Sequence, residues 1–138
     1  MDSSNKYCLH HFSYQRLPSL SVEVGNVGVG GNNPIRIQSM ASVSTMDTKA
    51  SVEEAIRMIK NGCEIIRFTA PNIKEAENLK HIQQALNDNG YTTPLVADIH
   101  YTPNAAEGAA KYVDKVRINP GNFAEKNLPS DEGLLKEQ

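Results

Sequence analysis

Apolar and polar residues alternate along this chain in blocks that predict four strands and three helices. The apolar runs are short and rich in branched residues, which is typical of buried strands. They cover Pro34–Met40, Glu64–Thr69, Leu95–Ile99 and Lys115–Ile118. Between these runs, apolar residues recur at the three- and four-residue spacing of amphipathic helices, over 51–61, 73–89 and 104–112. Strands that alternate with helices predict right-handed crossovers and a parallel sheet.

Local signals mark where these elements begin and end. Ser51 followed by Glu54 is a capping-box pattern, so the first helix is expected to begin there. Gly62 is a natural helix stop, and Asn72 is a suitable N-cap for the second helix. Pro120-Gly121 predicts a turn after the last strand.

A hairpin is predicted ahead of the first strand. Ser21–Val24 and Val27–Val29 alternate polar and apolar or small residues, and Gly25-Asn26 between them permits the positive φ angles of a tight turn. Residues 1–20 show no periodicity and are expected to form a poorly ordered lead-in.

Charged residues inside the strands favour a barrel over a doubly wound sheet. A doubly wound sheet buries both faces, so its strands should be almost wholly apolar, yet Arg36, Arg67 and Arg117 interrupt three of them. Inward positions at the carboxyl ends of barrel strands line the active site. A full barrel takes about 250 residues. We therefore expect an α/β fold in which residues 21–138 form the N-terminal half of a (β/α)8 TIM barrel, the hairpin preceding strands one to four.

Polar side chains converge at one end of this predicted half-barrel. Because successive strand residues point to opposite faces, one face collects Gln38, Arg67, Asp98, His100, Arg117 and Asn119. Arginine offers a charged fork that matches phosphate oxygens, so a phosphorylated or otherwise anionic ligand is expected. Asp98 is suited to orient a cation, and His100 to donate to a phosphate. Two ligands beside arginines do not make a metal site, so no metal site is expected, and no residue is assigned a catalytic role.

Composition narrows the class of protein. The net charge of −2 gives no reason to expect a nucleic-acid partner, and no apolar run is long enough to cross a bilayer. The N-terminus lacks the pattern of a signal or transit peptide, so a cytoplasmic protein without a membrane partner is expected. Cys8 and Cys63 are expected to stay reduced, and Cys8 with His10 and His11 lacks a second ligand pair at zinc spacing.

The ordered strand-end motifs resemble those of the 4-hydroxy-3-methylbut-2-enyl diphosphate synthase family, which depends on flavodoxin or ferredoxin. The matching segments run in unbroken order from about Ser21 to Asn122: Val24-Gly25-Asn26-Val27 with Gly30-Gly31, Gln38-Ser39-Met40, the strand of Arg67, Val96-Ala97-Asp98-Ile99-His100, and Arg117-Ile118-Asn119-Pro120-Gly121-Asn122. The spacing of the two last motifs makes the resemblance specific.

The resemblance implies a reaction and a division of labour. The family reductively converts 2-C-methyl-D-erythritol 2,4-cyclodiphosphate to 4-hydroxy-3-methylbut-2-enyl diphosphate in non-mevalonate isoprenoid biosynthesis. Its barrel holds the diphosphate, which implies substrate-binding roles for Arg67, Arg117 and Asn119, with Asp98 and His100 lining the pocket and Gln38 and Ser39 ending the first strand. A C-terminal domain carries a [4Fe-4S] cluster on three cysteines and a glutamate, ferredoxin or flavodoxin supplies electrons, and the enzyme is a homodimer.

The cluster ligands of that family have no match in this sequence. Cys8 and Cys63 do not correspond to them, so the C-terminal iron–sulfur domain is expected to be absent and the chain alone to be inactive. An alternative is a pterin-binding or other phosphate-binding TIM barrel, which also places Asp, Asn and Arg at strand ends. A third interpretation is a truncated piece without activity, which would aggregate or dimerise through its open strand edges.

Overall fold

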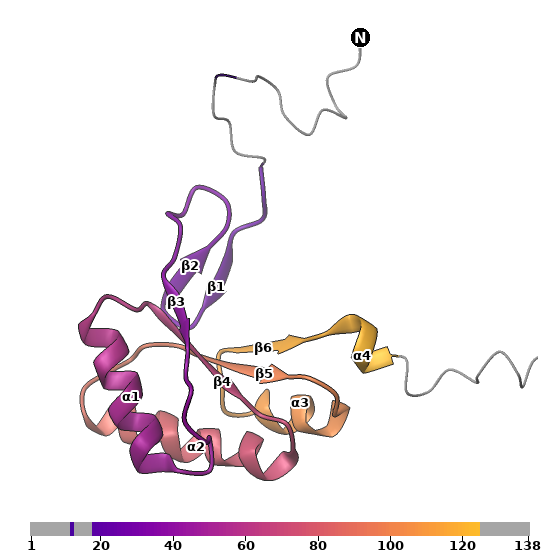
Figure 1. Ribbon diagram of the computed structural model, residues 1–138. Helices are drawn as coiled ribbons and strands as arrows, with labels where there is room; N and C mark the ends of the chain where they lie inside the picture. The colour runs from indigo at the N-terminus through magenta and orange to yellow at the C-terminus, as the bar shows by residue number, and fades with distance from the viewer. Residues whose placement is uncertain (1–11, 13–17, 125–138) are drawn as a thin grey trace, which may run out of the picture.

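The computed structural model describes residues 12 and 18–124, which form two sheets and four helices (Figure 1). The hairpin strands β1 (Val22–Val24) and β2 (Val27–Val29) are antiparallel. The main sheet is parallel, in the order β3-β4-β5-β6, with β3 (Gln38–Met40), β4 (Ile65–Thr69), β5 (Leu95–Ile99) and β6 (Lys115–Ile118). The helices are α1 (Thr48–Lys60), α2 (Ile73–Asp88), α3 (Pro103–Ala109) and α4 (Pro120–Ala124). The predicted α/β class with a parallel sheet is confirmed.

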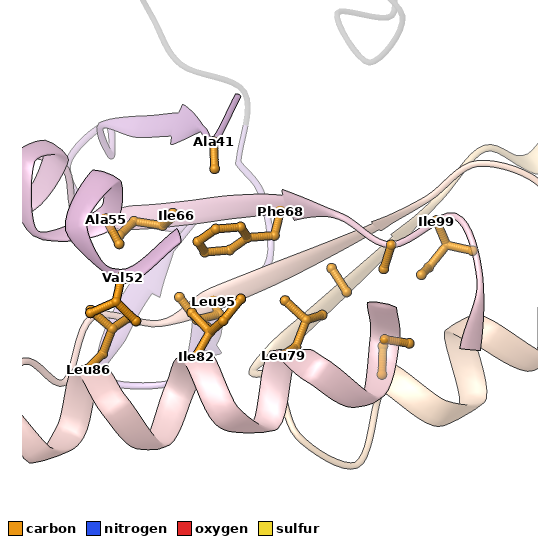
Figure 2. Close-up of a cluster of buried hydrophobic side chains, with 14 of the residues drawn as sticks. Ala41, Val52, Ala55, Ile66, Phe68, Leu79, Ile82, Leu86, Leu95 and Ile99 are labelled. Carbon is orange, nitrogen blue, oxygen red and sulfur yellow. The ribbon is translucent and has the colours of Figure 1, made fainter. Parts of the chain in front are cut away.

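The hydrophobic core lies between the sheet and its helices. Helices α1, α2 and α3 cover one side of the sheet, as Figure 1 shows. From the sheet, Ile66 and Phe68 of β4 point into this layer together with alternate residues of β5. Leu79, Ile82 and Leu86 of α2 point towards them and are fully buried (Figure 2). The predicted alternation of faces is thus confirmed for β4 and β5, the two central strands.

The first helix begins earlier than the capping-box pattern predicted. Asp47 is the N-cap of α1, because its carboxylate accepts a hydrogen bond from the backbone N–H of Ala50 (3.0 Å). Ser51 lies inside the helix and its hydroxyl donates to the carbonyl of Ser44 (3.2 Å). Glu54 turns away to the preceding loop, so the predicted Ser51–Glu54 capping box is wrong. Two other signals hold: Asn72 caps α2, and Gly62 follows α1 with a φ of +92°.

Replacement of Asp47 by alanine tests this helix start. Loss of the N-cap acceptor is expected to lower the free energy of unfolding by about 1 kcal/mol, measured by urea denaturation. The neighbouring exposed residue provides the control, and Lys49→Ala should leave stability within about 0.5 kcal/mol. An Asp47→Ala variant as stable as the control would contradict the assigned cap.

The first strand is shorter than predicted, and Arg36 lies outside it. Pairing of β3 with β4 is confined to Gln38–Met40. Arg36 precedes the strand, where its Nε donates to the carbonyl of Gly28 (2.7 Å) and its Nη1 contacts the carboxylate of Glu64 (3.0 Å). The same carboxylate accepts from the backbone N–H of Ile37 (2.9 Å). Arg36 therefore ties the hairpin to the start of β4, and its predicted position within the strand is wrong.

The hairpin docks at the amino end of the main sheet. Gly25 adopts a φ of +57°, and a Cβ there would lie 3.0 Å from the side chains of both Pro94 and Asp114, which precede β5 and β6. Asn26 donates to the hydroxyl of Thr92 (3.4 Å). The hairpin thus covers the end of the sheet opposite to the predicted site.

Smaller differences concern the last elements of the described chain. The predicted third helix over 104–112 is observed as α3 over Pro103–Ala109, and the predicted turn at Pro120-Gly121 is the first turn of α4.

His81 is exposed, as expected. The predictions for residues 1–17, including Cys8, His10 and His11, lie outside the described residues apart from position 12. Across the described part of the chain, none of the helices combines the length and the apolar character that crossing a bilayer requires.

Candidate functional site

One buried carboxylate gathers three basic side chains at the carboxyl end of the sheet. Asp98 on β5 is 1% exposed. Its Oδ2 accepts a hydrogen bond from Arg67 Nη2 (2.7 Å) and lies 3.3 Å from His100 Nε2. Its Oδ1 accepts from Arg117 Nη1 (3.0 Å). We call these four residues the Asp98 centre. The structure therefore brings together four of the residues that the sequence placed at one end of the half-barrel.

The strand register explains this convergence. Asp98 lies in register with Thr69 of β4 and with Arg117 of β6. Arg67 and His100 lie two residues from Thr69 and Asp98, so all four side chains of the centre leave the same face of the sheet, opposite to the helices. Parallel strands align their carboxyl ends, and ligands of parallel α/β proteins bind there. The register thus supplies a cationic surface at the edge where a ligand is expected.

The Asp98 centre keeps its carboxylate ionised. Burial raises the pKa of Asp98, but hydrogen bonds from Arg67 and Arg117 and the electrostatic attraction of Arg67 and His100 outweigh it, so the pKa lies below its ordinary value. Asp98 therefore remains a fixed negative charge between the two guanidinium groups.

Each arginine retains donors after binding Asp98. Both reach the carboxylate through a single terminal nitrogen, whereas a guanidinium carries five N–H donors. Arg67 Nε is buried and has no hydrogen-bond partner among the described residues. The side chains of Arg67 and Arg117 are 24% and 38% exposed. Free donors on partly exposed cations can bind the oxygens of an anionic group.

The remaining predicted site residues lie at different places. Asn119 directly follows β6, is half-buried, and its carbonyl accepts from the N–H of Phe123 (2.9 Å) as α4 begins. Gln38 is in register with Ile65, on the face of Arg67 but further from the carboxyl end. Ser39 is in register with Ile66, on the side that the helices cover. Gln38 and Ser39 line an open groove of about 540 Å³ against α1, so they are not part of the Asp98 centre.

A loop that the sequence pattern did not link to the site is held firmly beside this centre. Residues 41–47 connect β3 to α1, and Glu54 of α1 accepts three hydrogen bonds from them. A carboxylate three residues after a serine pointed to a capping box instead. The available signal was the run of hydroxyl-bearing residues directly after a strand. Segments that follow a strand in this way commonly form turns and contact ligands.

The described residues do not fit an iron–sulfur cluster. Among them, His, Cys, Asp and Glu side chains nowhere form a group of three or more that could hold a metal ion. Cys63 is free and buried, and its sulfur lies 3.1 Å from the carbonyl oxygen of Ile65, away from the Asp98 centre. No step of the chemistry can be assigned to a cluster on these residues.

Comparison with known proteins agrees with this geometry. Residues 19–132 match the family model of the GcpE TIM-barrel domain. Curated proteins named 4-hydroxy-3-methylbut-2-en-1-yl diphosphate synthase (flavodoxin) are similar to the chain. The one from Parabacteroides distasonis is 59% identical over 116 residues, which are 84% of this chain and 19% of the relative.

Two further relatives carry the same name. The protein from Protochlamydia amoebophila is 54% identical over 121 residues, 88% of this chain and 18% of the relative. That from Porphyromonas gingivalis is 55% identical over 127 residues, 92% of this chain and 22% of the relative. The chain thus spans about a fifth of the length of these relatives. Its parallel sheet is part of a TIM barrel, and the chain belongs to the GcpE family.

Proposed function

We propose that this chain is the first half of the substrate-binding barrel of an oxidoreductase. The reaction is the reductive conversion of 2-C-methyl-D-erythritol 2,4-cyclodiphosphate to 4-hydroxy-3-methylbut-2-enyl diphosphate in non-mevalonate isoprenoid biosynthesis. The observation that carries the proposal is the Asp98 centre, which presents two arginines at the carboxyl end of the sheet. Family membership supports the choice of ligand over a pterin.

The proposed roles follow from the contacts. Asp98 orients Arg67 and Arg117, whose remaining N–H groups bind the diphosphate oxygens. His100 uses Nε2 towards Asp98, which leaves Nδ1 for the ligand or for a water molecule. Asn119 adds an amide at the same end of β6. Gln38 lies on the face of Arg67 and is proposed to meet the substrate from the first strand, whereas Ser39 lies on the opposite face and has no proposed contact with it. Together these side chains bind and orient the substrate.

The redox part of the reaction is assigned to a region beyond the described residues. The [4Fe-4S] cluster, its flavodoxin or ferredoxin electron donor and a homodimeric assembly belong to the intact enzyme in this proposal. The relatives bear flavodoxin in their names, which supports that donor. In the same proposal the enzyme is cytoplasmic and has no nucleic-acid or membrane partner.

Removal of one guanidinium tests the proposal. In the intact enzyme, Arg117→Ala is expected to raise the Kd for the cyclodiphosphate about 10- to 100-fold, because a hydrogen bond to a charged group contributes roughly 1.5–3 kcal/mol. Isothermal titration calorimetry measures the Kd, and circular dichroism checks the fold.

The control removes an exposed positive charge elsewhere. Lys111→Ala lies after α3 and should leave the Kd within about twofold. An unchanged affinity in Arg117→Ala would remove Arg117 from the site. A wild-type enzyme that binds no cyclodiphosphate would contradict the proposed function itself.

A further inference from the structure

The loop over 41–47 lies next to the Asp98 centre. Its first residue, Ala41, donates through its backbone N–H to the carbonyl of Arg67 (2.8 Å). The buried hydroxyl of Thr45 donates to the carbonyl of Thr69 (2.6 Å), and Thr69 is the strand neighbour of Asp98. The loop therefore lies at the carboxyl end of the sheet, one strand spacing from the strand of the buried carboxylate.

Glu54 fixes the first part of this loop from the helix that follows it. Its Oε1 accepts from the hydroxyl of Ser42 (2.7 Å). Its Oε2 accepts from the backbone N–H groups of Ser42 (3.1 Å) and Val43 (3.2 Å). Burial raises the pKa of Glu54, but these hydrogen bonds outweigh it and hold the pKa below its ordinary value. Glu54, which is only 9% exposed, thus uses both carboxylate oxygens to bind this one loop.

Two further side chains hold the second part. Ser51 of α1 donates to the carbonyl of Ser44 (3.2 Å). Asn78 of α2 donates to the carbonyl of Thr45 (2.6 Å) and to the hydroxyl of Thr48 (2.9 Å). Successive loop residues are therefore tied to two helices and to β4.

The outer side of the same loop is open. Ser42, Ser44 and Met46 are exposed, and Met46 is 50% exposed. The backbone of the loop is thus fixed by hydrogen bonds with α1, α2 and β4, while three of its side chains are exposed. The loop lies at the end of the sheet where the Asp98 centre lies. This combination is typical of binding loops, whose shape is set by a rigid scaffold.

We propose that Glu54 is a positioning residue for the anion site, which holds the 41–47 loop as the wall on the β3 side of the Asp98 centre. This inference rests on the proposed function and deepens it. Glu54 does not touch the ligand. It acts through Ser42 and Val43, whose positions set how closely the loop approaches a diphosphate bound to Arg67.

The variant Glu54→Gln in the intact enzyme tests this role. The amide nitrogen of glutamine cannot accept a hydrogen bond, so contacts of one of the two carboxylate oxygens are lost. We expect the Kd for inorganic pyrophosphate and the KM for the cyclodiphosphate to rise about tenfold, while kcat stays within about twofold. Hydrogen exchange of the Ser42 and Val43 amides should accelerate, whereas that of β5 should not change.

A matched control lies one residue away. Glu53 is exposed on α1, and Glu53→Gln removes the same charge without touching the loop. It should leave the pyrophosphate Kd, the KM and the loop exchange unchanged. An equal effect of both variants would mean that net charge, and not loop position, sets the affinity, and would overturn the inference.

The other outcomes separate this inference from the proposed function. A wild-type enzyme that binds neither pyrophosphate nor the cyclodiphosphate contradicts both. A wild type that binds, with a Glu54→Gln variant whose loop is loosened but whose affinity is unchanged, contradicts only the role of Glu54. If Glu54→Gln does not fold, Ser42→Ala removes the hydroxyl contact alone, and an increase in Kd of about threefold is expected; an unchanged Kd with faster loop exchange would overturn the inference.

Discussion

Replacement of Asp98 by alanine is expected to lower the free energy of unfolding by about 3 kcal/mol. Removal of one partner of a buried ion pair costs roughly 3–5 kcal/mol, because the other charge is left uncompensated. Here Arg67 and Arg117 are partly exposed and recover some hydration, so the loss lies at the lower end of that range. Guanidinium denaturation of the variant and the wild type measures the difference.

The two arginines should not share this loss equally. Arg67 is the nearer partner of Asp98, at 2.7 Å against 3.0 Å for Arg117, and it is also the less exposed one. Double-mutant cycles should therefore give a larger coupling energy for Asp98 with Arg67 than with Arg117. Asp88→Ala, an exposed carboxylate at the end of α2, is the control and should change stability by less than about 0.5 kcal/mol. A stable Asp98→Ala variant would show that the centre contributes nothing to folding.

The stability difference between wild type and Asp98→Ala should depend on pH. The pKa of Asp98 is lower in the folded chain than its ordinary value of 3.8. Its stabilising contribution is therefore fully present above the unfolded-state pKa and is lost as the pH falls through the folded-state pKa. The difference should be constant near neutral pH and shrink below about pH 4. Glu54 and Glu64 titrate in both the wild type and the variant, so their contributions cancel in the difference between the two proteins.

Replacement of Phe68 by alanine is expected to cost about 4 kcal/mol of unfolding free energy. Phe68 is fully buried in the centre of the layer between β4 and α2, and Figure 2 shows its ring above Ile82 and Leu79. Phenylalanine-to-alanine changes in cores cost roughly 3–5 kcal/mol, because apolar contact is lost and a cavity remains. Chemical denaturation followed by far-ultraviolet circular dichroism measures the loss.

Two variants bracket this result. Phe68→Leu refills part of the space and should recover more than half of the loss. Ile73→Ala at the start of α2 removes a side chain that is 42% exposed and should cost about 1 kcal/mol or less. A Phe68→Ala variant within 1 kcal/mol of the wild type would mean that the layer repacks freely, contrary to the close contact of sheet and helix.

The central part of the fold was predictable because its pattern is unambiguous. In β4 and β5, alternate residues pack against α2, and the opposite residues carry Arg67 and Asp98. Periodicity of two therefore determined the core face and the polar face together, and aligned strand ends predicted that these polar residues meet. The contact of Asp98 with both arginines follows from that alignment, although no single strand reveals it.

The errors arose where a local pattern has two physical solutions. Ser51 and Glu54 match a capping box, but Asp47, one turn earlier, supplies an N-cap acceptor and allows a longer helix. Glu54 is then free to bind the preceding loop. Arg36 follows the alternation of the first strand, yet Glu64 and the carbonyl of Gly28 hold it before the strand begins. Such contacts join residues distant in sequence, and the local pattern carries no signal for them.

The strand order β3-β4-β5-β6 also bears on how the chain is made. Each strand after the first pairs with the strand synthesised immediately before it, across a single helix. Loop closure between neighbours costs little entropy, so each strand–helix unit can dock on a sheet that already exists while the ribosome is still extending the chain. The outer edge of β3 is the exception, because in a closed barrel it pairs with the last strand to be synthesised. Arg36 binds the carbonyl of Gly28 in the hairpin and, once β4 begins to be made, the carboxylate of Glu64. These contacts hold β3 in place, the strand that waits longest for its second neighbour.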